Sequence, residues 1–137
     1  MHAPLERSAE PVEGILGISI QVYGFDTGRG LPKPQDYRDC PYLYREGAYP
    51  TDWDRLKRRL HRAHLALGLV GDTLPEFLAS AFAPVGFPSI DLDLYSSTRD
   101  ALRLLETDQG RLLPRVFCYF DDIIGWAIGD SCKIGRA

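Results

Sequence analysis

The sequence predicts an α/β fold, with a Rossmann-like, mostly parallel sheet and helices on its faces. Patterns typical of strands and helices alternate along the 137 residues, in the order strand, helix, strand, helix, strand, helix, strand. Aspartates lie at or just after the ends of the predicted strands. The chain is 45% hydrophobic and 26% charged, the balance of a globular protein with one core. The alternation predicts parallel pairing through right-handed crossovers.

Three parts divide the chain. Residues 1–14 are polar and contain Pro4 and Pro11, so we expect an irregular N-terminal segment. Residues 15–125 carry the α/β pattern and form the predicted domain. Residues 126–137 form a tail, which we expect to be a helical turn or unstructured.

The first half of the domain combines a strand, a long loop and a helix. Alternating apolar residues predict a strand over residues 15–25. Residues 27–50 are rich in glycine, proline, aromatic and charged side chains, and a loop of this length is usually functional or mobile. Thr51 or Asp52 is a suitable N-cap for a helix that continues to about Ala63.

The second half of the domain contains three predicted strands and two helices. Residues 65–70 form a short strand, and a capping box at Thr73 begins a helix to about residue 82. Residues 87–94 form the next strand, after which Ser96 or Ser97 caps a helix to about residue 107. Residues 112–120 are almost continuously apolar, which is typical of a strand buried on both faces.

Charge and composition disfavour several classes of function. A net charge of −3 without a basic run argues against nucleic acid as a partner. No apolar stretch approaches the roughly 20 residues that span a bilayer, and the N-terminus lacks the pattern of a signal peptide. The three cysteines have no paired spacing, so neither a disulfide framework nor a zinc site is indicated. A reducing cytoplasm is the expected location.

Two acidic pairs are the most informative feature of the sequence. Asp91 and Asp93 end one predicted strand, and Asp121 and Asp122 end the next. One βαβ unit connects them, so we expect neighbouring strands about 4.8 Å apart. Carboxylates this close repel unless a cation neutralises them, and Mg²⁺ or Ca²⁺ prefers such oxygen ligands. A carboxylate that acts as a base through a raised pKa is the alternative.

Other acids have weaker functional signals. Asp26 and Asp72 follow predicted strands at the same edge of the sheet, where open α/β sheets bind ligands. Each is explained equally well as a loop or capping residue. We expect Asp100 and Asp108 to be structural residues of this kind.

Four motifs, in order, resemble the macrocin O-methyltransferase family. They are Tyr23-Gly-Phe-Asp-Thr27 with Gly30-Leu31-Pro32, Gly71-Asp-Thr-Leu-Pro75, Ile90-Asp-Leu-Asp-Leu-Tyr-Ser-Ser-Thr98 and Phe120-Asp-Asp122. The resemblance covers about residues 20–125, and the Asp-x-Asp-x-Tyr-x-Ser-Thr run is its most specific part. The family contains class I sugar O-methyltransferases that use S-adenosylmethionine. The resemblance therefore implies methyl transfer to a hydroxyl of a sugar or similar small molecule.

The resemblance also implies a role for each acid. Three carboxylates would ligate Mg²⁺, which would hold two hydroxyls of the acceptor: Asp91, Asp121 and Asp122. Asp93 would be the general base that removes a proton from the acceptor hydroxyl. Asp26 would hydrogen-bond the ribose of the cofactor, and Asp72 would lie near its adenine. The loop over residues 28–49 would help to cover the site.

The chain departs from the family's pattern at both ends. The family begins with an apolar strand and a glycine-rich turn that holds the methionine part of the cofactor, and no comparable motif precedes Ile20. The C-terminal strands of the family are absent as well. We therefore expect an incomplete fold, from a fragment, misassigned gene boundaries or a degenerate paralogue. The absent strand would lie between the strands that bear Asp26 and Asp91, and exposed strand edges predict a homo-oligomer.

Two other functions stay open. A phosphatase of the haloacid dehalogenase type also uses an Asp-x-Asp motif after a strand. The segment between Asp93 and Asp121 is too short for the later motifs of such an enzyme and contains no lysine. The other alternative is a non-catalytic remnant that oligomerises or binds a partner.

Overall fold

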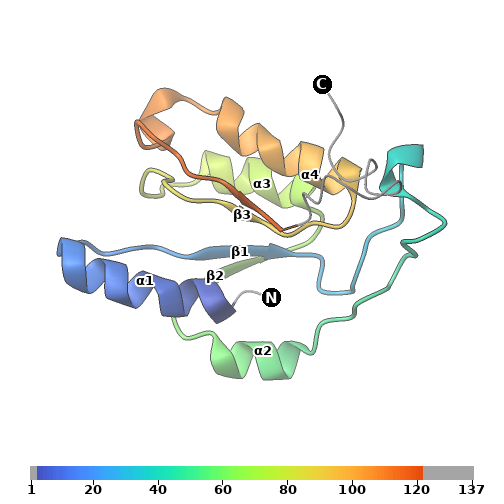
Figure 1. Cartoon of the computed structure of the whole chain (residues 1–137), viewed down its shortest axis with the longest axis horizontal. Coiled ribbons are helices and arrows are strands. Elements are labelled where there is room, and N and C mark those ends of the chain that lie inside the picture. The colour runs from blue at the N-terminus through green and yellow to red at the C-terminus, as the bar shows by residue number, and fades with distance from the viewer. Residues whose placement is uncertain (1–2, 122–137) are drawn as a thin grey trace.

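The computed structural model describes residues 3–121, in which strands and helices alternate (Figure 1). The elements are α1 (Ala3–Leu16), β1 (Tyr23–Asp26), η1 (Tyr37–Asp39), α2 (Trp53–Arg59), β2 (His64–Leu67), α3 (Val70–Ala79), β3 (Ser89–Ile90), α4 (Tyr95–Leu102), η2 (Arg103–Glu106), η3 (Gln109–Arg111) and β4 (Tyr119–Phe120). The predicted mixed α/β class is confirmed. Asp122 and the predicted tail lie outside the described residues. Within residues 3–121, no helix is long and apolar enough to cross a membrane.

The strands pair in parallel, as the sequence predicts, but in two separate sheets. β1 pairs with β2 from Tyr23 opposite His64 to Asp26 opposite Leu67. β3 pairs with β4. An isolated parallel bridge also joins Val85 to Leu112, before these two strands begin. Figure 1 shows α3 and α4 on one side of the strands and α1 and α2 on the other. All four strands therefore have their carboxyl ends at the same edge of the molecule (Figure 1).

An aromatic cluster packs α3 against the β1–β2 sheet. The ring of Phe77 lies 4.8 Å from that of Tyr23 and meets Phe25 edge-on at 5.5 Å. Phe82 stacks on Phe77 at 4.2 Å. Aromatic pairs at these distances stabilise beyond the area that they bury. The four rings are half-buried, and the buried apolar side chains of the described residues are Ala9, Cys40, Leu74, Ile90 and Leu94.

The N-terminal segment is a helix, not the irregular segment that the sequence predicts. Pro4 is the second residue of α1, where its missing N–H leaves no hydrogen bond unmade. The predicted strand over residues 15–25 shrinks to Tyr23–Asp26, because its first residues belong to α1. Ile20 donates its N–H to Glu13 at 2.6 Å instead of to a neighbouring strand.

Two of the three predicted helix caps differ from the structure. Asp52 caps α2 by accepting from the N–H of Arg55 at 3.0 Å, as predicted. α3 already begins at Val70, so Thr73 lies inside it and donates its hydroxyl to the Leu69 carbonyl at 3.1 Å. The predicted capping box is therefore wrong. α4 begins at Tyr95 and has no side-chain cap of its own.

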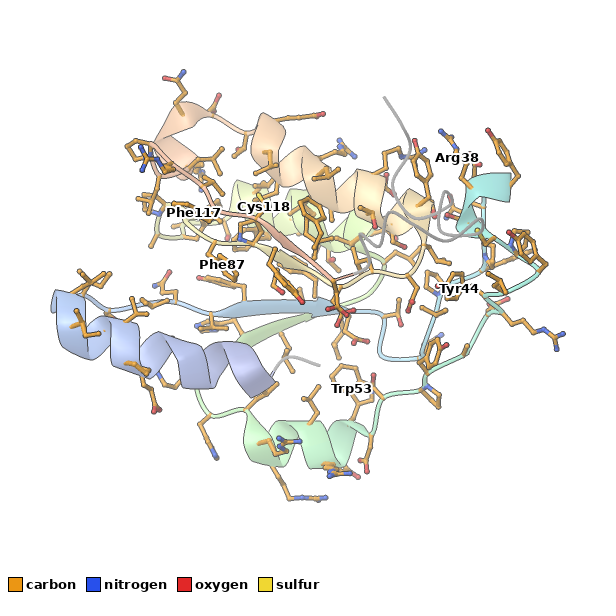
Figure 2. The ribbon with its side chains drawn as sticks, in the orientation of Figure 1. Arg38, Tyr44, Trp53, Phe87, Phe117 and Cys118 are labelled. Carbon is orange, nitrogen blue, oxygen red and sulfur yellow. The ribbon has the colours of Figure 1, made fainter. Side chains whose placement is uncertain are left out.

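The predicted strand over residues 112–120 is short and is not buried on both faces. Only Tyr119 and Phe120 form β4, and 62% of Phe117 is exposed. Phe87, from the segment that leads into β3, is also 53% exposed, and Figure 2 shows it beside the β3–β4 pair. Tyr119 of β4 is 51% exposed as well, so these aromatic side chains lie in solvent.

The cysteines differ from one another in the structure. Cys40 is buried and takes part in a disulfide, which the sequence analysis does not predict. Cys118 is a free, half-buried thiol.

Candidate functional site

The parallel register of β3 and β4 brings two of the predicted acids to the same edge. Ser89 lies opposite Tyr119 and Ile90 opposite Phe120, so Asp91 and Asp121 are the next residues on neighbouring strands. The N–H of Asp121 donates to the carbonyl of Ile90 at 3.1 Å, which continues the ladder to the acids.

The side chains around this edge are open to solvent. Asp91 and Asp121 are exposed, and Asp121 accepts a hydrogen bond from the hydroxyl of Tyr119 at 2.8 Å. Asp93 is half-buried in the turn before α4. Residues 3–121 contain no group of three acidic, histidine or cysteine side chains placed to hold a metal, and Asp122 lies outside this range. The assignment of the metal ligands therefore stays a prediction.

Asp26 and Asp72 follow the two strands of the other sheet. Asp26 is the last residue of β1, and its carboxylate accepts from the N–H of Gly28 at 2.7 Å. This bond holds the chain in a tight turn at the sheet edge. Asp72 is exposed in the first turn of α3, which begins three residues after β2. The structure thus places both residues at the carboxyl edge, where parallel sheets bind ligands.

A buried carboxylate that the sequence analysis misses, Asp39, anchors the long loop. It has no exposed surface and accepts from the N–H and the hydroxyl of Ser96 at 2.7 and 2.9 Å. The N–H groups of Gln35 and Asp36 donate to it at 2.7 and 3.1 Å. Asp39 therefore supplies the N-terminal cap of α4 from 57 residues away.

The hydrogen bonds decide the ionisation of Asp39. Burial alone raises its pKa, but the donors from Ser96, Gln35 and Asp36 outweigh burial, and the pKa of Asp39 is lowered from 3.8. The carboxylate is therefore ionised at neutral pH, at the positive end of α4.

Arg38 adds a second connection between the loop and α4. Its guanidinium lies 3.9 Å above the ring of Tyr95 and donates to the Tyr95 hydroxyl at 2.8 Å. Asp36 accepts from the same guanidinium at 2.6 and 3.0 Å, and this partner lowers the pKa of Asp36 to about 2. Tyr95 and Ser96 belong to the Asp-x-Asp-x-Tyr-x-Ser-Thr run that begins at Asp91. Two residues of this run therefore hold the loop in place through Arg38 and Asp39.

An open cavity of about 780 Å³ lies where the loop meets the ends of β1 and β2. Its lining comes from the start of the loop, from the loop near its end, from the first residue of α2 and from the connection between β2 and α3. The lining residues are Thr27, Gly28, Arg29, Gly30, Leu31, Pro32, Lys33, Gln35, Glu46, Gly47, Trp53, Leu67, Gly68 and Leu69. Trp53 lies between α2 and the end of β1 (Figure 2). This volume is within the roughly 300–1,000 Å³ typical of small-molecule sites.

No family model matches the chain, and no curated protein or solved structure matches it. The resemblance to the macrocin O-methyltransferase family accordingly stays a prediction from the four motifs.

Proposed function

We propose that this chain is a domain of the metal-dependent O-methyltransferase type, with S-adenosylmethionine as donor and a small hydroxyl compound as acceptor. The observation that carries the proposal is the β3–β4 register, since it sets Asp91 and Asp121 side by side at one edge. The end of β1 with Asp26 and a cavity of suitable size lie at the corresponding edge of the other sheet. Acids and cavity at the carboxyl ends of parallel strands fit a ligand site of this fold class.

The donor set suits Mg²⁺. Carboxylate oxygens are the ligands that this hard cation prefers, and Asp91 and Asp121 are both exposed to an incoming ion. Asp122 is the proposed third ligand. Bound Mg²⁺ would supply Lewis acidity that lowers the pKa of an acceptor hydroxyl.

The remaining acids have the roles that the motifs imply. Asp93 would accept the proton from the acceptor hydroxyl. S-adenosylmethionine would supply the methyl group to that oxygen and leave as S-adenosylhomocysteine. Asp26 would hydrogen-bond the ribose hydroxyls of the cofactor, and Asp72 would lie near its adenine. The loop, which Asp39 and Arg38 hold against α4, would help to cover the site.

A magnesium titration tests this assignment. We expect Asp121→Asn to weaken Mg²⁺ binding, measured by calorimetry, by about tenfold or more, because a neutral amide replaces an anionic ligand. Asp108→Asn is the matched control, since Asp108 is an exposed acid outside the site, and its Mg²⁺ affinity should equal that of the wild type. Unchanged affinity in Asp121→Asn would show that the metal assignment is wrong.

A second candidate is a non-catalytic protein that acts through self-association. The exposed aromatic residues beside β3 and β4 favour this function, because a parallel sheet is normally covered on both faces. We propose a homo-oligomer under either function. The cytoplasmic location also stays a proposal.

A further inference from the structure

The cavity at the ends of β1 and β2 has walls that are fixed by hydrogen bonds, although they belong to a loop. Leu31 donates its N–H to Ala48 at 2.7 Å and accepts from the N–H of Gly47 at 2.8 Å, which closes the loop on itself. The indole N–H of Trp53 donates to the carbonyl of Gly28 at 2.7 Å. A pocket held in this way is formed before a ligand arrives, so binding does not have to order the loop.

At two glycines the backbone of these walls lies close to neighbouring groups. Gly30 has a φ of +84°, and a Cβ there would lie 2.4 Å from the carbonyl oxygen of Ala48. A Cβ on Gly28, whose φ is +76°, would lie 3.1 Å from the indole of Trp53. Because glycine has no Cβ, Gly30 can lie close to the carbonyl of Ala48, and Gly28 can lie close to the indole of Trp53.

The lining combines apolar surface with an excess of positive charge. Leu31, Leu67 and Trp53 supply apolar and aromatic surface. Arg29 and Lys33 are exposed cations of the lining, and Glu46 is its one acid. A cavity with this composition favours a ligand that has an apolar or ring body and a negative charge.

We propose that the cavity binds a small organic anion, whose phosphate or carboxylate lies against Arg29 and Lys33 and whose ring or apolar body lies against Trp53 and Leu31. Arginine binds such oxyanions through paired N–H donors, and lysine binds them as a point charge. Anion binding itself does not depend on methyl transfer.

Calorimetry with 1-naphthyl phosphate tests the proposal on the whole chain, without S-adenosylmethionine or Mg²⁺. We expect saturable binding that weakens with added salt, and binding of 1-naphthol that is about tenfold weaker or absent. The double variant Arg29→Gln/Lys33→Gln should bind 1-naphthyl phosphate about tenfold or more weakly than the wild type. Circular dichroism establishes that the variant is folded.

The matched control is Arg58→Gln/Arg59→Gln, which removes the same charge from the exposed surface of α2. This control should bind 1-naphthyl phosphate as the wild type does. Equal losses in both double variants, or no loss in the cavity variant, would overturn the proposal. Asp121→Asn should leave this binding unchanged, so failure of the anion site and failure of the metal site give different results.

Discussion

At the scale of single residues, Asp39 shows how a cap can come from far along the chain. The serines after the Asp-x-Asp motif predict a helix start, and α4 does begin there. The expected cap, however, is Ser96 or Ser97, whereas the structure caps α4 with Asp39 from the loop. Local sequence rules cannot find such a partner, because they consider only neighbouring residues.

Asp39→Asn tests this anchor through stability. The substitution keeps the size of the side chain but turns one acceptor into a donor that faces N–H groups. We expect the free energy of unfolding, measured with urea, to fall by about 2–4 kcal/mol. Asp108→Asn changes an exposed acid, and it should shift stability by less than about 0.5 kcal/mol. A loss as small as that of the control would mean that Asp39 does not anchor the loop.

The pH dependence of stability gives a separate test of Asp39. Because its pKa is lowered in the folded state, its contribution is complete above the ordinary value of 3.8 and is lost as the pH falls through the lowered pKa. Below about pH 4, the wild type should therefore lose stability more steeply than Asp39→Asn. Parallel acid-unfolding curves for the two proteins would contradict the assigned ionisation.

At the scale of elements, the sequence predicts the order of strands and helices and the long loop better than their lengths. The strand predicted over residues 112–120 is wrong in length and burial, because only Tyr119 and Phe120 form β4 and Phe117 and Tyr119 are more than half exposed. Strand pairing depends on tertiary contacts that local patterns do not contain. The sequence predicts that Asp91 and Asp121 share one edge, as the β3–β4 register shows. It does not predict the cavity, because the cavity forms from loop segments distant in sequence.

Two glycine substitutions test the loop as an element. Gly30→Ala should lower the free energy of unfolding by about 2 kcal/mol or more, because φ is positive and the new Cβ meets a backbone carbonyl. Gly14→Ala lies in α1 with no atom near the new Cβ, so it should stabilise by about 0.5–1 kcal/mol. Thermal unfolding measures both. Equal effects at the two positions would show that the loop is not fixed as described.

At the scale of the whole molecule, the strands form two small sheets where the sequence predicts one. In residues 3–121, β1 pairs only with β2 and β3 only with β4, which leaves strand edges open. Open edges and exposed aromatic residues both favour association with another chain. This geometry supports the proposed homo-oligomer.

Sedimentation velocity tests the association. The wild type should sediment as a dimer or larger, and Phe87→Ser/Phe117→Ser should shift it toward the monomer, because the exposed aromatic face loses its apolar surface. Tyr49→Ser is the matched control, since Tyr49 is 70% exposed on the loop, and it should not change the assembly. A wild type that sediments as a monomer at high concentration would refute the proposed oligomer.

Calorimetry with S-adenosylmethionine in the presence of Mg²⁺ tests the proposal that the carboxyl edge of these strands is a methyltransferase site. The proposed function predicts binding with a dissociation constant in the micromolar range, about −8 kcal/mol at 1 μM, and weaker binding in Asp26→Asn, since Asp26 is the proposed ribose ligand. The absence of any binding heat at millimolar S-adenosylmethionine would contradict the methyltransferase assignment and favour the non-catalytic alternative.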